Sequence, residues 1–262
     1  MKKDQAKLAR IAGLPAVSAL FAAAPERVER LFFDERMKQQ AGAFCASLAR
    51  ARKPYRLVGD DELQRVAGSA MHGGIVALAQ LAPITAFDPS LTKSWAQDGR
   101  LLIILDGIGN PQNLGAIART AAFFGLKRML LSDHPAQALP SDASYRIAEG
   151  GLDYMSLYRA ARLPNVLKQM RPLFHVVGTA LGKGRPLGDL AKSDRPLALV
   201  FGNEEQGLSP ATLKACETTV TIAGAGKVQS LNVAATAAIF IHAALEGVSK
   251  SSKRYAEKRE LT

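Results

Sequence analysis

Cysteine and histidine are scarce in this sequence of 262 residues, which has 2 cysteines and 4 histidines. Cys45 and Cys216 lie far apart and form no CxxC pair, so we predict neither a disulfide framework nor a zinc site. The histidines show no i, i+4 ligand spacing and have no cysteines or paired carboxylates beside them; they are His72, His134, His175 and His242. We therefore expect no bound metal, and a reducing compartment, the cytoplasm.

The sequence also lacks an apolar run long enough to span a membrane. Its most apolar helical stretch, residues 231–245, contains Asn, Thr and His and is shorter than the ~20 apolar residues that a bilayer requires. The basic start before residues 11–24 imitates a secretory signal, but Asp4 and Pro15 interrupt that pattern. Apolar residues at steps of three and four predict a folded helix there instead; they are Val17, Leu20, Phe21, Ala24, Val28 and Leu31.

Acidic residues are too few to balance the basic ones. The chain has 34 Lys and Arg against 23 Asp and Glu, a net charge of +11 and a pI of about 9.8. This excess of positive charge indicates a polyanionic partner. Hydrophobic residues make up 48% of the chain, which is enough for one large or two modest globular domains.

Residues 1–82 alternate helical and extended patterns and predict a small α/β domain. We expect helices over 28–52 and 60–69 and strands over 55–59 and 74–80. A basic cluster of Arg50, Arg52, Lys53 and Arg56 follows the first of these helices. It is either a solvated helix end or a phosphate contact. Residues 83–98 contain two prolines and no sustained periodicity, which predicts a linker.

Residues 99–248 show a regular series of strands and helices. Apolar strands are expected at 101–107, 128–132, 155–160, 174–179, 197–203 and 218–223, with helices at 113–125, at 165–170, from Pro210, and up to Glu246. Uninterrupted apolar strands between helices predict an α/β fold with a mainly parallel sheet covered on both faces. The polar, basic tail at 249–262 is expected to be mobile.

The first candidate motif is DGIGNPQNLGAIART at residues 106–120, where a strand runs through a turn into a helix. Ligands bind at such a turn because strand ends and free helix N–H groups converge there. A dinucleotide fingerprint fails, since Gln112 stands where its third glycine belongs. Taken alone, Asn113 could be a helix cap and Arg119 a solvated helix residue.

The second and third motifs also follow predicted strands. In LALVFGNEEQGLSP, residues 197–210, Ser209 and Pro210 start a helix, and the adjacent Glu204 and Glu205 repel unless one meets a cation or ligand. In TIAGAGKVQSLNVAATA, residues 221–237, Ser230 reads as a helix N-cap with Asn232 in the first turn. The P-loop spacing of glycines, Lys and Ser or Thr is absent.

Together the three motifs resemble those of the SpoU (TrmH-type) family of RNA ribose 2′-O-methyltransferases in the SPOUT superfamily. NPQNLGAIART, GNEEQGLS and SLNVAATA stand in the family's order, and residues 11–80 resemble its amino-terminal RNA substrate-binding domain. The resemblance implies Asn113, Arg119, Glu204, Ser230 and Asn232 as catalytic residues. It also implies a deep trefoil knot, and a homodimer with the site close to the dimer interface.

The resemblance implies S-adenosylmethionine as cofactor and a ribose 2′-hydroxyl of structured RNA as methyl acceptor, with ribosomal RNA ahead of transfer RNA. Its cofactor-binding positions are Thr179, Gly202, Asn203, Gly207, Ile222, Leu231 and Asn232. Because arginine stays protonated, we expect Arg119 to bind an RNA phosphate and stabilise the forming alkoxide. A non-catalytic RNA-binding or ribosome-assembly factor that retains the fold is the alternative.

Overall fold

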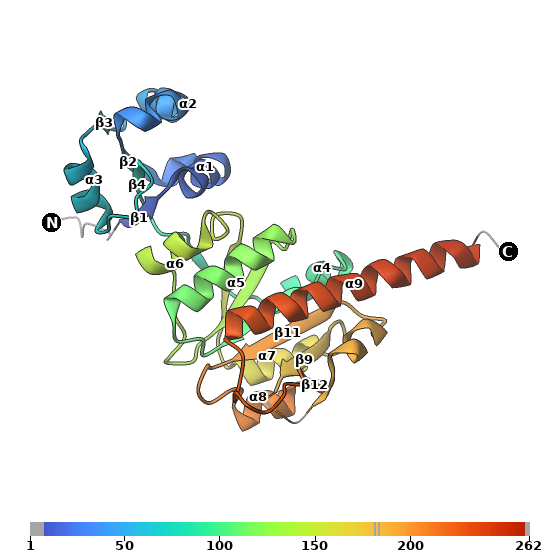
Figure 1. The fold of residues 1–262 in the computed structure, drawn as a ribbon. Coiled ribbons are helices and arrows are strands. Elements are labelled where there is room, and N and C mark those ends of the chain that lie inside the picture. The colour runs from blue at the N-terminus through green and yellow to red at the C-terminus, as the bar shows by residue number, and fades with distance from the viewer. Residues whose placement is uncertain (1–7, 181, 183, 260–262) are drawn as a thin grey trace.

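The structure is a computed structural model that describes residues 8–180, 182 and 184–259. It contains two sheets, one of four strands near the amino terminus and one of eight strands in the rest of the chain (Figure 1). The charged residues of the signal-like start lie outside the described residues; they are Lys2, Lys3, Asp4 and Lys7. No helix in the described part of the chain has both the length and the apolar character needed to cross a bilayer.

The amino-terminal sheet has the strand order β1-β4-β2-β3. β4 (Ile75–Ala79) pairs antiparallel with β1 (Ala9–Ala12) and β2 (Val28–Phe33), and β3 (Tyr55–Leu57) pairs parallel with β2. The helices are α1 (Leu14–Ala23), α2 (Lys38–Arg50) and α3 (Asp60–Ala67), with 3-10 turns η1 (Pro25–Arg27) and η2 (Glu35–Met37).

One predicted helix in this domain is wrong over its first part. Residues 28–33 form β2 rather than a helix, and α2 begins only at Lys38. Asp34 ends the extended segment, because its side chain accepts a hydrogen bond from the Met37 N–H at 3.2 Å and starts η2. Val28 and Leu31 are therefore buried strand residues, and the helix predicted from Val17 ends at Ala23.

The larger sheet has the strand order β10-β12-β9-β11-β6-β7-β8-β5, and every neighbouring pair is parallel. Its strands are β5 (Ile84–Ala86), β6 (Leu102–Asp106), β7 (Arg128–Ser132), β8 (Ser156–Ala160), β9 (His175–Thr179), β10 (Arg185–Pro186), β11 (Leu197–Gly202) and β12 (Thr218–Thr221). The predicted parallel α/β architecture is confirmed. The trefoil knot stays a prediction.

Helices cover both faces of this sheet (Figure 1). One face packs against α5 (Pro111–Phe123), α6 (Asp142–Ala148) and α9 (Val233–Arg259), and the other against α4 (Leu91–Gln97), α7 (Leu163–Met170) and α8 (Pro210–Ala215). Within β6, Ile103 and Leu105 face the first core and Leu102 and Ile104 the second. Strand side chains alternate between faces, so a strand buried on both sides is apolar throughout.

Residues 83–98 are not an irregular linker, contrary to the sequence prediction. β5 pairs with β8 at the edge of the large sheet, and α4 buries Trp95 against its second face. A three-residue strand and a seven-residue helix are too short to give a clear periodicity. α6, η3 (Leu187–Lys192) and β10 are also short elements that the sequence analysis did not predict. α9 continues to Arg259, beyond the predicted end at Glu246.

A buried hydrogen-bond network joins the two domains. Arg27 of η1 donates to the Asp153 carboxylate at 2.7 Å and to the Tyr145 hydroxyl at 2.8 Å. The same hydroxyl accepts from the Ala82 N–H at 2.9 Å. Burial raises the pKa of Asp153 despite the opposing effect of Arg27, and Asp153 Oδ2 has no hydrogen-bond partner among the described residues.

Replacing Arg27 by Met should destabilise the chain strongly. The variant would leave the Asp153 side chain, whose exposure is 0%, without its cation. Loss of one partner of a buried ion pair costs about 3–5 kcal/mol of unfolding free energy. Urea unfolding measures this loss, and Arg27→Met combined with Asp153→Asn should recover most of it. A single variant as stable as wild type would contradict this role of the ion pair.

Candidate active site

The three sequence motifs meet at the carboxyl ends of neighbouring strands. β12, β9, β11 and β6 lie side by side in this order, so their carboxyl ends form one edge of the sheet. The first motif follows β6, the second follows β11 and the third follows β12. The sequence motifs predict a ligand site at this edge.

The turn of the first motif is fixed by its own polar residues. Asn110, not Asn113, caps α5, because its side chain accepts from the Gln112 N–H at 2.8 Å and Pro111 takes the first helical position. Asn113 is thereby free for other contacts and is buried, with 8% of its surface exposed. Gln137 closes the turn by accepting from the N–H groups of Gly107 at 3.0 Å and Ile108 at 3.2 Å.

A chain of side-chain hydrogen bonds links one residue of each motif. Asn113 Nδ2 donates to Glu204 Oε1 at 2.8 Å, and Asn232 Nδ2 donates to Asn113 Oδ1 at 3.0 Å. These residues are 91 and 119 positions apart in sequence. Asn113 can serve both neighbours because an amide carries a donor and an acceptor.

Glu204 is the acceptor on which the first turn and the second motif converge. Besides Asn113, its carboxylate accepts from the N–H groups of Gly109 at 3.0 Å and Asn110 at 3.3 Å. Burial acts to raise the pKa of Glu204, but these hydrogen bonds outweigh it and the pKa is lowered. The adjacent Glu205 is exposed, so the two carboxylates have different environments.

The loop of the second motif is compact. Asn203 and Gly207 exchange backbone hydrogen bonds at 3.0 and 2.9 Å, and the Asn203 side chain donates to the Gly107 carbonyl at 2.7 Å. A Cβ at Gly202 would overlap the peptide between Gly207 and Leu208, so only glycine permits this turn. The predicted N-cap of α8 is confirmed, since the Ser209 hydroxyl accepts from the Thr212 N–H at 3.1 Å.

In the third motif, the predicted N-cap of the last helix is wrong. Asn232, rather than Ser230, caps α9, because its Oδ1 accepts from the N–H of Ala234 at 2.8 Å and of Ala235 at 3.4 Å. One amide therefore caps the last helix with its oxygen and contacts Asn113 with its nitrogen. Ser230 is exposed and makes no hydrogen bond to another described residue.

The positions expected to bind the cofactor lie at this same edge. Thr179 ends β9 and donates from its hydroxyl to the Val200 carbonyl at 3.1 Å, and Ile222 directly follows β12. Leu231 is 51% exposed, as is Val228 at 79%, although both are apolar. From residue 223 to residue 231, no backbone N–H donates to another described residue. Exposed apolar side chains beside open backbone donors fit a nucleoside ligand such as S-adenosylmethionine.

Arg119 lies apart from this hydrogen-bonded group. It is on α5, six residues after Asn113, and its guanidinium pairs with the carboxylate of Glu149 at 2.8 Å. Both side chains are about half exposed, at 55% and 48%. Glu149, which pairs with Arg119, and Gln137, which closes the turn of the first motif, belong to no recognisable motif. The sequence alone therefore does not predict their contacts.

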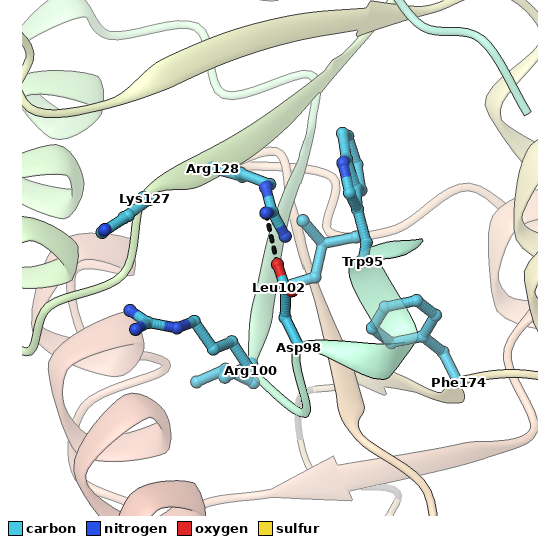
Figure 2. Close-up of a pocket in the computed structure, with 8 residues that line it drawn as sticks. Trp95, Asp98, Arg100, Leu102, Lys127, Arg128 and Phe174 are labelled. Atoms are coloured by element: carbon cyan, nitrogen blue, oxygen red, sulfur yellow. Dashed lines mark hydrogen bonds and ion pairs between the residues drawn. The ribbon is translucent and has the colours of Figure 1, made fainter. Parts of the chain in front are cut away.

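A separate cavity of about 330 Å³ lies near the opposite edge of the sheet, where β6 and β7 begin (Figure 2). Arg128 pairs there with Asp98, and its guanidinium lies 5.3 Å from the centre of the Trp95 ring. This contact anchors α4 to the sheet and is remote from the three motifs. Among the described residues, no group of three or more His, Cys, Asp or Glu side chains is arranged to hold a metal ion.

The sequence matches two families over adjacent segments. Residues 100–242 match the SpoU rRNA Methylase family, and residues 10–84 match the family described as RNA 2′-O ribose methyltransferase substrate binding. The chain belongs to the SpoU family of RNA methyltransferases, which confirms the resemblance seen in its motifs. It is accordingly a methyltransferase. Two structures of the same fold, an rRNA methyltransferase from Sinorhizobium meliloti and the SpoU methyltransferase AviRb from Streptomyces viridochromogenes, at 22% and 23% identity, were solved with AdoMet bound.

Curated relatives and solved structures agree with this family. A protein of Acinetobacter baylyi named 23S rRNA (guanosine-2′-O-)-methyltransferase RlmB is 31% identical over 88% of this chain and 94% of its own. The uncharacterized tRNA/rRNA methyltransferase YfiF of Escherichia coli O157:H7 is 30% identical over 92% of this chain and 69% of its own. The fold matches a crystal structure of an rRNA methyltransferase from Sinorhizobium meliloti with a TM-score of 0.76, at 21% identity, over 92% and 88% of the two chains.

Replacing Glu204 by Gln should make the stability of the chain less dependent on pH. Because the folded-state pKa of Glu204 is lowered, its contribution is fully present above the ordinary value of 4.5 and is lost as the pH falls through the lowered pKa. We expect Glu204→Gln to lower the unfolding free energy by about 1–3 kcal/mol near neutral pH. This deficit should shrink in acid.

Urea unfolding over a series of pH values measures this difference. Glu205→Gln is the matched control, because its exposed carboxylate accepts no hydrogen bond from another described residue. A deficit for Glu204→Gln that stayed constant down to the onset of acid unfolding would contradict the assigned role of the charge.

Proposed function

We propose that this chain methylates the ribose 2′-hydroxyl of a nucleotide in structured RNA, with ribosomal RNA as the substrate class. The hydrogen-bond chain from Glu204 through Asn113 to Asn232 carries this proposal, because it joins all three motifs of the family at one edge of the sheet. The RlmB relatives, named as 23S rRNA guanosine-2′-O-methyltransferases, support the same substrate class. The net charge of +11 favours RNA binding.

We propose that the cofactor binds across the carboxyl ends of β9, β11 and β12. Thr179, Ile222 and Leu231 supply backbone and apolar contacts, and Gly202, Asn203 and Gly207 shape the intervening loop. Asn232 fixes where the last loop ends, because it caps α9. S-adenosylmethionine supplies an electrophilic methyl group at this edge.

Asn113, Glu204 and Asn232 act in this proposal as positioning residues. Both polar ends of the Asn113 amide are occupied by the other two, so its role is to hold the loops together. Glu204 positions the first turn through the N–H groups of Gly109 and Asn110 rather than through Arg119. Ser230 is exposed, and its hydroxyl makes no hydrogen bond to another described residue. In this proposal its hydroxyl is therefore available to contact the ribose of the substrate.

Arg119 is proposed to bind an RNA phosphate beside the reacting ribose. A 2′-hydroxyl is a weak nucleophile and must lose its proton as its oxygen bonds to the methyl carbon. The bond from that carbon to the sulfonium sulfur of the donor would break in the same step and leave a neutral thioether. The guanidinium remains protonated and lowers the cost of the developing negative charge, while the proton passes to a phosphate oxygen or to water. Arg119 lies on the accessible surface of α5, where RNA can reach it.

The chain is further proposed to form a homodimer through the surface where α5 and α9 lie side by side. Phe123 at the end of α5 is 83% exposed and Ile239 of α9 is 38% exposed. Phe124 lies 6.2 Å from His242 between ring centres and connects the two helices. Exposed apolar side chains on adjacent helices are typical of such an interface. Light scattering tests this, and a purely monomeric mass would exclude it.

Calorimetry with S-adenosylmethionine and mapping of 2′-O-methylated nucleotides test the function together. We expect saturable cofactor binding, and the loss of one or more ribose methylations from ribosomal RNA in a strain that lacks the gene. Purified chain should restore them in vitro. A chain that binds RNA but not the cofactor would support the alternative, a non-catalytic assembly factor.

Arg119→Lys should slow methyl transfer while preserving RNA affinity. Lysine keeps the positive charge but loses the planar fork that contacts two phosphate oxygens at once. We expect the single-turnover rate to fall by about 10- to 100-fold, with a dissociation constant for RNA close to that of wild type. A near-normal rate would refute the role proposed for the guanidinium.

A further inference from the structure

The ion pair between Arg119 and Glu149 involves a glutamate whose backbone is in the left-handed region. Glu149 ends α6 in the left-handed region, with φ 43° and ψ 46°. Glycine adopts this conformation at little cost, whereas a residue with a Cβ is strained there. The chain nevertheless has a glutamate at this position, and its carboxylate lies 2.8 Å from the guanidinium.

The backbone around Glu149 is held tightly against α5. A Cβ at Gly151 would lie 2.7 Å from Arg119 Cα, and a Cβ at Gly115 would overlap the Ser144 carbonyl of α6. α5 therefore approaches α6 at backbone contact distance near Gly115, and it approaches the segment that follows α6 at the same close distance near Arg119. The backbone at Glu149 is consequently held close to the helix that bears Arg119, and the Glu149 carboxylate pairs with that arginine.

The same segment contacts the amino-terminal domain. A Cβ at Gly150 would overlap the Cβ of Ala19 in α1, and it would lie 3.3 Å from the Pro15 carbonyl. Arg27 reinforces this contact through Tyr145 of α6 and Asp153. Residues 149–151 thus lie between the amino-terminal domain on one side and the Arg119 helix on the other.

We propose that Glu149 is a positioning residue for methyl transfer, which holds the Arg119 guanidinium in the orientation that receives the RNA phosphate. The inference rests on the proposed function of Arg119. Because both side chains are half exposed, the ion pair adds little to folding, and its value lies in the direction it imposes on the guanidinium. Because the adjacent Gly150 packs against α1, the position of Glu149 is also linked to the domain that is expected to hold RNA.

Two variants test the proposal with ribosomal RNA from a strain that lacks the gene. Glu149→Gln removes the charge, and Glu149→Gly removes the side chain while relieving the backbone strain. For both we expect a single-turnover rate about tenfold below wild type. The dissociation constant for RNA should stay equal or become smaller, because a negative charge has been removed. The melting temperature should be unchanged in the first variant and unchanged or higher in the second.

Asp194→Asn is the matched control, since it removes an exposed carboxylate that forms no ion pair with another described residue and precedes β11, at the sheet edge opposite to the three motifs. It should leave the rate unchanged. Arg119→Ala separates the two proposed roles: if it is inactive while both Glu149 variants keep rates within twofold of wild type, only the positioning role is wrong. If Arg119→Ala itself retains full rate, the proposed function of Arg119 fails as well.

A double variant gives the remaining check. Arg119→Ala combined with Glu149→Gln should be no slower than Arg119→Ala alone, because Glu149 acts through Arg119. Additive losses in the double variant would overturn the proposal. So would a loss of RNA binding and thermal stability in Glu149→Gln in proportion to its loss of rate, because that pattern indicates a general structural defect.

Discussion

The hydrogen bonds of Asn113 constrain the whole candidate site. Its amide donates to Glu204 and accepts from Asn232, so three loops from distant parts of the sequence are held in one geometry. Each partner also makes a second contact, since Glu204 binds the turn after β6 and Asn232 caps α9. A displacement of the loop that bears Asn113 would break contacts with both other loops, and a displacement of either of those would break its contact with Asn113. Because the amide is buried, an unmade hydrogen bond there would carry a desolvation penalty.

Glycine contacts extend this constraint to the helix that carries Arg119. Gly115 lets α5 approach α6 at backbone distance, and Gly151 does the same between α5 and the segment after α6. Gly150 of that segment packs closely on the amino-terminal domain. Asn113 and Arg119 lie on the same 13-residue helix. One end of α5 is therefore fixed by the three-motif hydrogen bonds, while its middle is fixed by α6. The helix connects the expected cofactor edge with the expected phosphate contact as a single rigid element.

Sequence patterns predicted most elements of the large domain because its central strands β6 and β11 are buried along their whole length and the strands around them are separated by regular helical segments. β6, β7, β8, β9 and β11 were found close to their true bounds, as were α5, α7 and α8. β5 and α4 are too short for periodicity to reveal, and β2 was misread because its apolar residues also fit a helical spacing. For the site, the motifs identified the right loops but not their contacts. Which asparagine caps a helix and which one reaches another loop depends on the fold, and so does the pairing of Arg119 with Glu149.

The chain places its charged groups in two different environments. At the domain junction, Arg27 and Asp153 are buried, and their pairing is costly to break but also costly to form. Such a pair fixes the relative orientation of the domains more than it adds stability. Arg119 and Glu149 are half exposed, so water competes for both and an incoming phosphate can compete too. The first pair suits a permanent joint and the second a contact that RNA must rearrange. Residues 149–151 connect these two ion pairs, because they pack on the amino-terminal domain and include the glutamate that pairs with Arg119.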